Sequence, residues 1–131
     1  HSIKKKLPLI CFSTSGGARM QESMISLFEM GKTSAAVKKL KKAKQPFISI
    51  LIDPCYGWVT ASLAMLGDLV VAEPKARIGF SGKRVIQDTV KEELPENFQT
   101  AEKQLEKGFL DKIVDRRNLR DFLEKILTIM E

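Results

Sequence analysis

Short apolar segments alternate with longer segments of helical periodicity along this chain, and no other feature constrains its fold as strongly. Residues 7–13 and residues 46–53 are apolar runs with the length of buried strands. Between them, residues 20–40 place apolar side chains at helical spacing. Strands that alternate with helices are typical of α/β folds, in which helical crossovers connect parallel strands. We therefore predict an α/β architecture.

The second half of the chain continues this alternation in shorter pieces. Residues 58–67 predict a short buried helix with Gly67 as its C-cap. The remaining expected elements are strands at residues 69–74 and 76–82, helices at residues 84–92, 100–107 and 118–130, a loop at residues 93–98 and an extended segment at residues 110–114. No repeat or linker divides the sequence, so we expect one domain at residues 1–131, organised like the back half of a larger α/β domain.

The chain carries a formal net charge of +6, and its lysines are clustered. Six lysines and no acidic residue lie between positions 32 and 44. Such clusters attract phosphate groups or acidic partners, although most of them are solvated helix faces. Aromatic residues do not alternate with these lysines, so nucleic-acid binding by base stacking is not favoured. No segment approaches the roughly 18 apolar residues of a membrane span, and we expect no membrane partner.

The sequence lacks the side chains of the common catalytic sites. Its only histidine is His1, so neither a Ser-His-Asp nor a Cys-His arrangement is available. Two cysteines without an internal histidine exclude a compact zinc site, and we expect Cys11 and Cys55 to be free, buried thiols in a reducing compartment. Residues 31–33 (GKT) end like a P-loop, but Ser26 stands where that motif needs glycine, and the segment lies within a predicted helix.

Two segments share a design that supports catalysis by the backbone. Residues 11–20 and residues 51–62 each predict a strand, a glycine-containing turn and a helix. A helix start leaves N–H groups without partners, and the helix dipole favours negative charge there. Two such N–H groups that converge on one point form an oxyanion hole, which stabilises an enolate or tetrahedral oxygen without a side-chain acid. A tight connection explains either turn alone, whereas the two turns together favour a functional role.

Five sequence blocks carry a resemblance to a known family. They are SGGARMQE, MGKTSAA, TASLAMLGD, AEPKARIGFSGKRVI and LPENFQTAEKQLEKGFLDKIVDRR. From about Leu7 to the C-terminus, the chain resembles the carboxyltransferase β subunits of the multi-subunit acetyl-CoA carboxylases of bacteria and plastids. The blocks SGGARMQE and GFSGKRVI are specific to that family. The resemblance implies a crotonase-like (ClpP-type) fold in which ββα units stack as a superhelix, present here as a partial domain.

The same resemblance implies the second half-reaction of acetyl-CoA carboxylation. In that reaction the carboxyl group of carboxybiotin passes to the enolate of acetyl-CoA and gives malonyl-CoA, and decarboxylated biotin supplies the base. Backbone N–H groups are expected to hold the thioester oxygen or the ureido oxygen. The implied donors are the N–H groups of Gly16, Gly17, Gly57 and Trp58, and the implied substrate-binding residues are Ser15, Arg19, Gly82 and Arg84.

Partners and cofactors are also implied by the resemblance. Biotin arrives on a biotin carboxyl carrier protein, the substrate is a coenzyme A thioester, and the active site forms with a carboxyltransferase α subunit in an α2β2 assembly. The family carries a four-cysteine zinc ribbon at its N-terminus, so we expect this chain to be the C-terminal portion of such a subunit, with zinc only in the missing ribbon. The expected compartment is the bacterial cytoplasm or the plastid stroma.

The second turn departs from the family pattern. The family usually reads Thr-Thr-Gly-Gly-Val-Thr, whereas residues 55–60 read CYGWVT, so that Trp58 replaces a glycine. Tryptophan keeps the N–H group but adds a Cβ, which disfavours positive φ, and a large indole where a substrate needs close approach. This departure keeps open a degenerate, non-catalytic homologue that acts as a scaffold or subunit partner. A carboxylase or decarboxylase of another acyl-CoA is a related alternative, and a basic nucleic-acid-binding domain is a third, which rests on the net charge alone.

Overall fold

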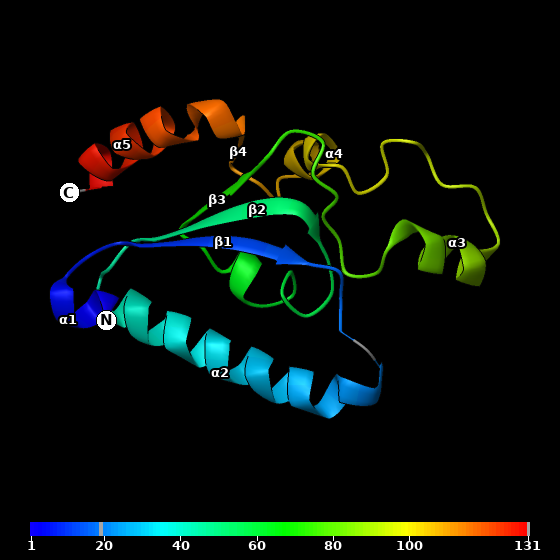
Figure 1. Cartoon of the computed structure of the whole chain (residues 1–131), viewed down its shortest axis with the longest axis horizontal. Helices are drawn as coiled ribbons and strands as arrows, with labels where there is room; N and C mark the ends of the chain where they lie inside the picture. The colour runs from blue at the N-terminus through cyan, green and yellow to red at the C-terminus, as the bar shows by residue number, and fades with distance from the viewer. Residues whose placement is uncertain (19, 131) are drawn as a thin grey trace.

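The centre of the molecule is a four-stranded, entirely parallel sheet in the order β1-β2-β3-β4 (Figure 1). The strands are β1 (Leu9–Ser15), β2 (Phe47–Cys55), β3 (Leu69–Ala72) and β4 (Lys112–Ile113). They are seen in a computed structural model that describes residues 1–18 and 20–130. Neighbouring parallel strands need crossover connections, which the intervening helical segments supply. The predicted α/β architecture is confirmed.

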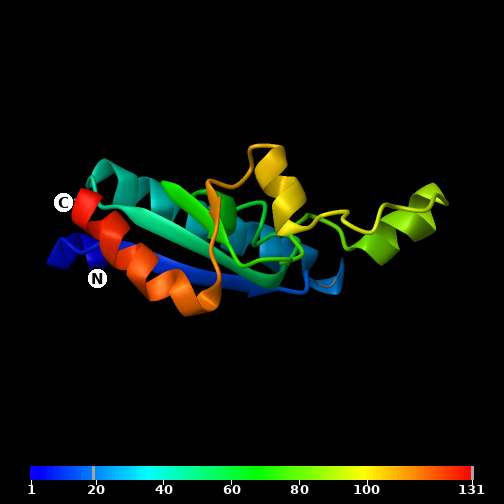
Figure 2. The same ribbon diagram turned by 90° about the horizontal axis from the view of Figure 1, so that it is seen from above.

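Helices cover both faces of the sheet (Figures 1 and 2). The long helix α2 (Ser23–Lys42) connects β1 to β2 and packs against Phe47 on one face. On the other face, α5 (Leu119–Met130) packs against Ile50. The other helices are α1 (Ser2–Lys5), α3 (Lys83–Val90), α4 (Ala101–Glu106) and the 3₁₀ helices Met20–Glu22, Leu63–Met65 and Arg116–Asn118. Within residues 1–18 and 20–130, none of the helices combines the length and the apolar character that crossing a bilayer requires.

Strand β2 forms the middle of the hydrophobic core. Phe47, Ile48, Ile50 and Leu51 are all fully buried. A parallel strand that is covered by helices on both faces has no side open to solvent, so its sequence is a continuous apolar run. Burial of each such side chain contributes about 1.5–3 kcal/mol. This packing fixes the carboxyl end of β2, and therefore the second glycine turn, beside β1.

Residues 58–67 differ from the predicted helix. The segment consists of turns followed by the single 3₁₀ turn Leu63–Met65. The Ser62 hydroxyl donates to the Trp58 carbonyl at 2.6 Å, and the Ser62 N–H donates to the Val59 carbonyl at 3.3 Å. A serine side chain that bonds nearby backbone groups competes with regular helix formation. The apolar spacing of this segment therefore reflects burial beneath the sheet and not an α-helix.

Residues 76–82 differ from the predicted strand. In this segment only Arg77 and Ile78 form bridges, and each bridge is isolated: Arg77 pairs with Thr100 and Ile78 with Cys55. The segment is thus held beside the end of β2 by single contacts and not by a ladder. The expected helices and the extended segment further along the chain are confirmed as α3, α4, α5 and β4.

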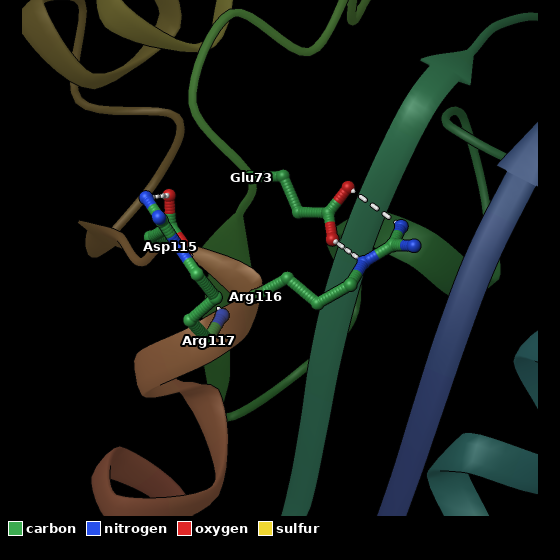
Figure 3. A network of polar contacts seen from close by, with 4 residues as sticks. All are labelled: Glu73, Asp115, Arg116 and Arg117. Atoms are coloured by element: carbon green, nitrogen blue, oxygen red, sulfur yellow. Dashed lines mark hydrogen bonds and ion pairs between the residues drawn. The ribbon is translucent and has the colours of Figure 1, made fainter.

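Ion pairs fix the segment that precedes α5 (Figure 3). Arg116 Nε and Nη2 donate to the two carboxylate oxygens of Glu73, at 2.6 and 3.0 Å. The Asp115 carboxylate accepts from the side chain and the backbone N–H of Arg117, and these bonds lower its pKa to about 2. Because Glu73 follows β3 directly, these contacts join the start of α5 to the end of that strand.

Candidate functional site

The two glycine turns lie against each other at the carboxyl ends of β1 and β2. Ser15 and Cys55 are paired in the sheet, and the Tyr56 N–H donates to the Ser15 carbonyl at 2.9 Å. Gly17 has a φ of +100° and Gly57 a φ of +71°, a region that favours glycine. A Cβ at Gly57 would lie 3.0 Å from the Gly17 Cα atom, so the two backbones approach more closely than side chains would allow.

The hydrogen bonds of these turns determine which N–H groups are available. The Gly17 N–H donates to the Ser15 hydroxyl at 3.1 Å, and the Gly57 N–H donates to the Phe80 carbonyl at 2.8 Å. Two of the four expected donors, Gly17 and Gly57, therefore have partners within the chain. Among the described residues, the N–H groups of the other two expected donors, Gly16 and Trp58, have no acceptor, and neither does the N–H group of Ala18. Gly57 begins a turn whose first hydrogen bond runs from the Ala61 N–H to the Gly57 carbonyl, which explains the unpaired Trp58 N–H.

A pocket of 380 Å³ lies beside the two turns, between α2 and residues 58–63. Its walls are mainly apolar, and the carboxylates of Glu22 and Glu29 provide the negative charge in its lining. Ala18 and Trp58 both line it, so two unpaired N–H groups belong to residues of the same pocket. The full lining is Ser15, Ala18, Glu22, Ile25, Ser26, Glu29, Met30, Thr33, Trp58, Val59, Ser62 and Leu63.

The Trp58 indole forms a wall of this pocket without filling it. Its ring packs edge-to-face on Phe80, with centroids 5.4 Å apart and an interplanar angle of 88°. Such aromatic pairs contribute about 0.5–1.5 kcal/mol beyond their buried area. Phe80 also supplies the carbonyl that accepts from Gly57, so the same residue fixes the indole and the glycine turn.

Only one of the expected substrate-binding residues that the structure describes lies at the pocket. Ser15 lines the pocket and orients Gly17. Gly82 is the N-cap of α3 and Arg84 is exposed on that helix, which projects away from the body of the molecule (Figures 1 and 2). Neither of these two residues lines the pocket, so the structure does not bring them to the site. Arg19 lies outside the described residues.

An ion pair joins the end of β2, just before the second turn, to the segment that follows β3. Arg77 Nε and Nη2 donate to the two carboxylate oxygens of Asp53, each at 2.9 Å. The Arg77 carbonyl accepts from the Cys55 N–H at 2.8 Å, and the Gly79 N–H donates to the Cys55 carbonyl at 3.1 Å. These bonds hold the Phe80 carbonyl where it accepts from Gly57. The Arg77 side chain also lowers the pKa of the Asp53 carboxyl.

We expect replacement of Asp53 by asparagine to weaken the acid sensitivity of folding. Because the folded-state pKa of Asp53 is lowered, the stabilisation is present above the usual value of 3.8 and is lost as the pH falls below it. Both side chains are roughly half exposed, so the loss at neutral pH is only about 0.5–1 kcal/mol. Urea unfolding between pH 2 and pH 7 measures this. Glu124→Gln, which removes the exposed pair with Arg120, is the matched control. If the free energy of unfolding became equally less dependent on pH in both variants, the role of Asp53 would be contradicted.

The two cysteines do not provide a nucleophile. Both thiols are free, and Cys55 is buried whereas Cys11 is partly exposed. Burial raises the pKa of the Cys55 thiol, although a hydrogen bond from Thr60 opposes this shift. A reactive cysteine needs a lowered pKa and access to solvent. In the part of the chain that the structure describes, no three His, Cys, Asp or Glu side chains are grouped so that they could hold a metal ion.

The parallel α/β scaffold with its two apposed glycine turns, together with the fold that it shares with carboxyltransferase domains, places the chain in the class of crotonase-like domains. The particular family follows from comparison with known families. Residues 1–123 match the family described as Carboxyl transferase domain, so the chain belongs to that family.

Solved structures of carboxyl-transferring and related enzymes share the fold. The chain is 29% identical to transcarboxylase 12S, with a TM-score of 0.78 over 96% of this chain and 24% of that chain. That hexameric enzyme was solved with hydrolysed methylmalonyl-coenzyme A bound. The fold is also similar to the Pseudomonas malonate decarboxylase MdcD–MdcE heterodimer, at 21% identity, TM-score 0.64, and 89% of this chain against 60% of that chain. The fold is similar as well to that of a single-chain, multi-domain long-chain acyl-CoA carboxylase, with 22% identity and a TM-score of 0.63. This match covers 87% of this chain and 11% of that chain. The chain thus spans about a quarter of the transcarboxylase chain.

The sequence-based prediction omits Ala18. A sequence signal for this residue does exist, because Ala18 follows the paired glycines directly and precedes a predicted helix, where N–H groups lack partners. The Asp53–Arg77 pair is also absent from the prediction, since its two residues are 24 positions apart and no local pattern links them.

Proposed function

We propose that this chain is the β-type portion of an acetyl-CoA carboxyltransferase, which transfers the carboxyl group of carboxybiotin to acetyl-CoA and forms malonyl-CoA. The observation that carries the proposal is the apposition of two glycine turns that leaves the Ala18 and Trp58 N–H groups unpaired beside one pocket. Membership of the carboxyl transferase family supports the reaction type. The choice of acetyl-CoA rests on the resemblance of the sequence blocks to the β subunits.

The chain contributes electrostatic stabilisation and not proton transfer. The unpaired N–H groups of Ala18 and Trp58 hold the thioester oxygen as it gains negative charge on enolate formation. The mainly apolar walls lower the local dielectric constant, which strengthens these hydrogen bonds. An apolar pocket with N–H donors fits a neutral ureido group as well, and Ser15 keeps the first turn in shape. When bound, carboxybiotin supplies the carboxyl group and, after its release, the base that the histidine-free site lacks.

The proposed assembly contains a carboxyltransferase α subunit and the biotin carboxyl carrier protein, with α2β2 stoichiometry. The relatives transcarboxylase 12S and malonate decarboxylase form a hexamer and a heterodimer respectively, which supports an oligomeric site. We further propose that residues 1–131 correspond to the C-terminal portion of the subunit, that zinc belongs to a ribbon outside this portion, and that the complex acts in the bacterial cytoplasm or plastid stroma.

Reconstitution with a carboxyltransferase α subunit tests the proposed activity. The assay follows decarboxylation of malonyl-CoA in the presence of a biotin derivative, which is the reverse of carboxyl transfer. We expect turnover that depends on both chains. If the native chain shows no turnover under conditions in which a Trp58→Gly variant works, the native sequence does not carry the activity.

A non-catalytic scaffold is the second candidate function, and the tryptophan in the second turn favours it. Trp58 places an indole in the wall of the pocket where the family has glycine, and the Gly57 N–H is already bonded to Phe80. Because the chain contains one tryptophan, its fluorescence reports on this turn alone. Perturbation of the fluorescence by the α subunit but not by acetyl-CoA favours the scaffold, and perturbation by acetyl-CoA favours the enzyme.

A further inference from the structure

The C-terminal half of α2 presents a lysine-rich face to a second hollow. Lys38, Lys41 and Lys42 occupy positions i, i+3 and i+4, so they are neighbours on one side of the helix. The hollow has a volume of 560 Å³, and its opposite wall comes from the segment that follows the second glycine turn. It is lined by Val37, Lys38, Lys41, Lys42, Ala61 and Leu66, together with a serine of α2.

The charge of this hollow is not neutralised within the described part of the chain. Lys41 pairs with Asp68 at 3.4 Å, whereas Lys38 and Lys42 have no carboxylate within 4.0 Å. The C-terminal end of a helix carries roughly half a negative charge, which offsets only part of the remaining positive charge. Like charges at i, i+4 repel one another. An anion in the hollow would relieve this repulsion.

The hollow lies along the same helix as the pocket beside the glycine turns. Pocket and hollow are both bounded by α2 on one side and by residues 58–66 on the other. From Met30, which lines the pocket, to Lys41, which lines the hollow, α2 rises by roughly 17 Å. A ligand that reaches both sites needs phosphate groups at one end, a reactive carbonyl at the other, and a long flexible arm between them.

We propose that Lys38 and Lys42 bind the phosphate-bearing nucleotide end of a coenzyme A thioester in this hollow, while its acyl end reaches the glycine turns. The inference rests on the proposed function and assigns it a specific anion site. Coenzyme A joins its phosphates to the thioester through a pantetheine arm, which matches the required ligand. The hollow has no aromatic residue in its lining, so it does not offer the stacking platform that single-stranded nucleic acids use.

Calorimetric titration of the full chain tests this site with three ligands: coenzyme A, 3′-dephospho-coenzyme A and S-acetylpantetheine, which has no phosphate. We expect the double variant Lys38→Glu/Lys42→Glu to bind coenzyme A about tenfold more weakly, because two attractions become repulsions. Its affinity for S-acetylpantetheine should change less than about twofold. Added salt should weaken coenzyme A binding alone. The control Lys107→Glu/Lys125→Glu changes the same charge at exposed positions that make no ion pair within the described residues.

Each other outcome overturns the assignment in a recognisable way. An equal loss of coenzyme A affinity in both double variants means that only net charge matters. If the lysine variant loses affinity for S-acetylpantetheine as much as for coenzyme A, the two lysines stabilise the fold and do not bind a phosphate. If the lysine variant weakens binding of a duplex oligonucleotide but not of coenzyme A, the surface serves nucleic acid. Equal affinity of the native chain for coenzyme A and S-acetylpantetheine removes the phosphate site alone, whereas binding of neither removes the proposed function as well.

Discussion

Replacement of Gly57 by alanine is expected to lower kcat for carboxyl transfer at least about a hundredfold, the usual effect of losing one oxyanion donor. The φ of +71° costs an alanine about 1–2 kcal/mol relative to glycine. The new Cβ would also lie 3.0 Å from Gly17 Cα and 3.6 Å from Ala18 N. Since these are backbone atoms, the first turn must move, and the Ala18 N–H moves with it. Kinetics of the reconstituted complex and thermal unfolding followed by circular dichroism measure the two effects.

Gly31→Ala is the matched control for this variant. Gly31 lies in the middle of α2, its φ is not positive, and a Cβ added there would meet nothing within 4 Å beyond the backbone of the helix itself. The same added methyl group should stabilise the helix by up to about 1 kcal/mol and leave the rate unchanged. Assays at a temperature where both variants are folded separate turn geometry from stability. A folded Gly57→Ala protein with the native rate would show that contact between the two turns is not needed for the reaction.

The positions of the two turns follow from local sequence features. β1 and β2 both begin with apolar runs and are followed within two residues by glycine, so their location and parallel pairing could be predicted. β1 differs from the expected buried strand, because it is the edge strand of the sheet and its Phe12 side chain is exposed. The segment after Gly57 could not be predicted in detail. Its apolar residues have helical spacing, but the Ser62 hydroxyl bonds the Trp58 carbonyl, and the chain forms turns and one 3₁₀ helix instead.

The availability of each N–H group depends on contacts that sequence patterns do not contain. Gly57 looks like a donor from its place after a strand, yet its N–H bonds to Phe80, which is 23 positions away along the chain. Phe80 is held in this place by the backbone hydrogen bonds that Arg77 and Gly79 make with Cys55. Local patterns therefore predict where an oxyanion hole can form, whereas tertiary hydrogen bonds decide which amides remain free to form it.

A comparison of proline and alanine at position 58 tests directly whether the free N–H group of Trp58 takes part in the reaction. Both substitutions remove the indole and its contact with Phe80, but only proline removes the N–H group. Trp58 is the first residue of a turn that begins at Gly57, where proline fits helical geometry, and Gly57 has no Cβ to clash with the proline ring. We expect the kcat of Trp58→Pro to be about 10²–10³-fold lower than that of Trp58→Ala.

The two variants should have similar unfolding temperatures and similar affinity for S-acetylpantetheine, because the lost N–H group acts mainly on the charge that develops during the reaction. Kinetics of the reconstituted complex, with circular dichroism as the check on folding, supply the comparison. Equal rates in two folded variants would show that the Trp58 amide does not touch the reacting oxygen. The stabilising donor would then have to come from Ala18 alone or from the partner subunit, and the tryptophan would serve only as a wall of the pocket.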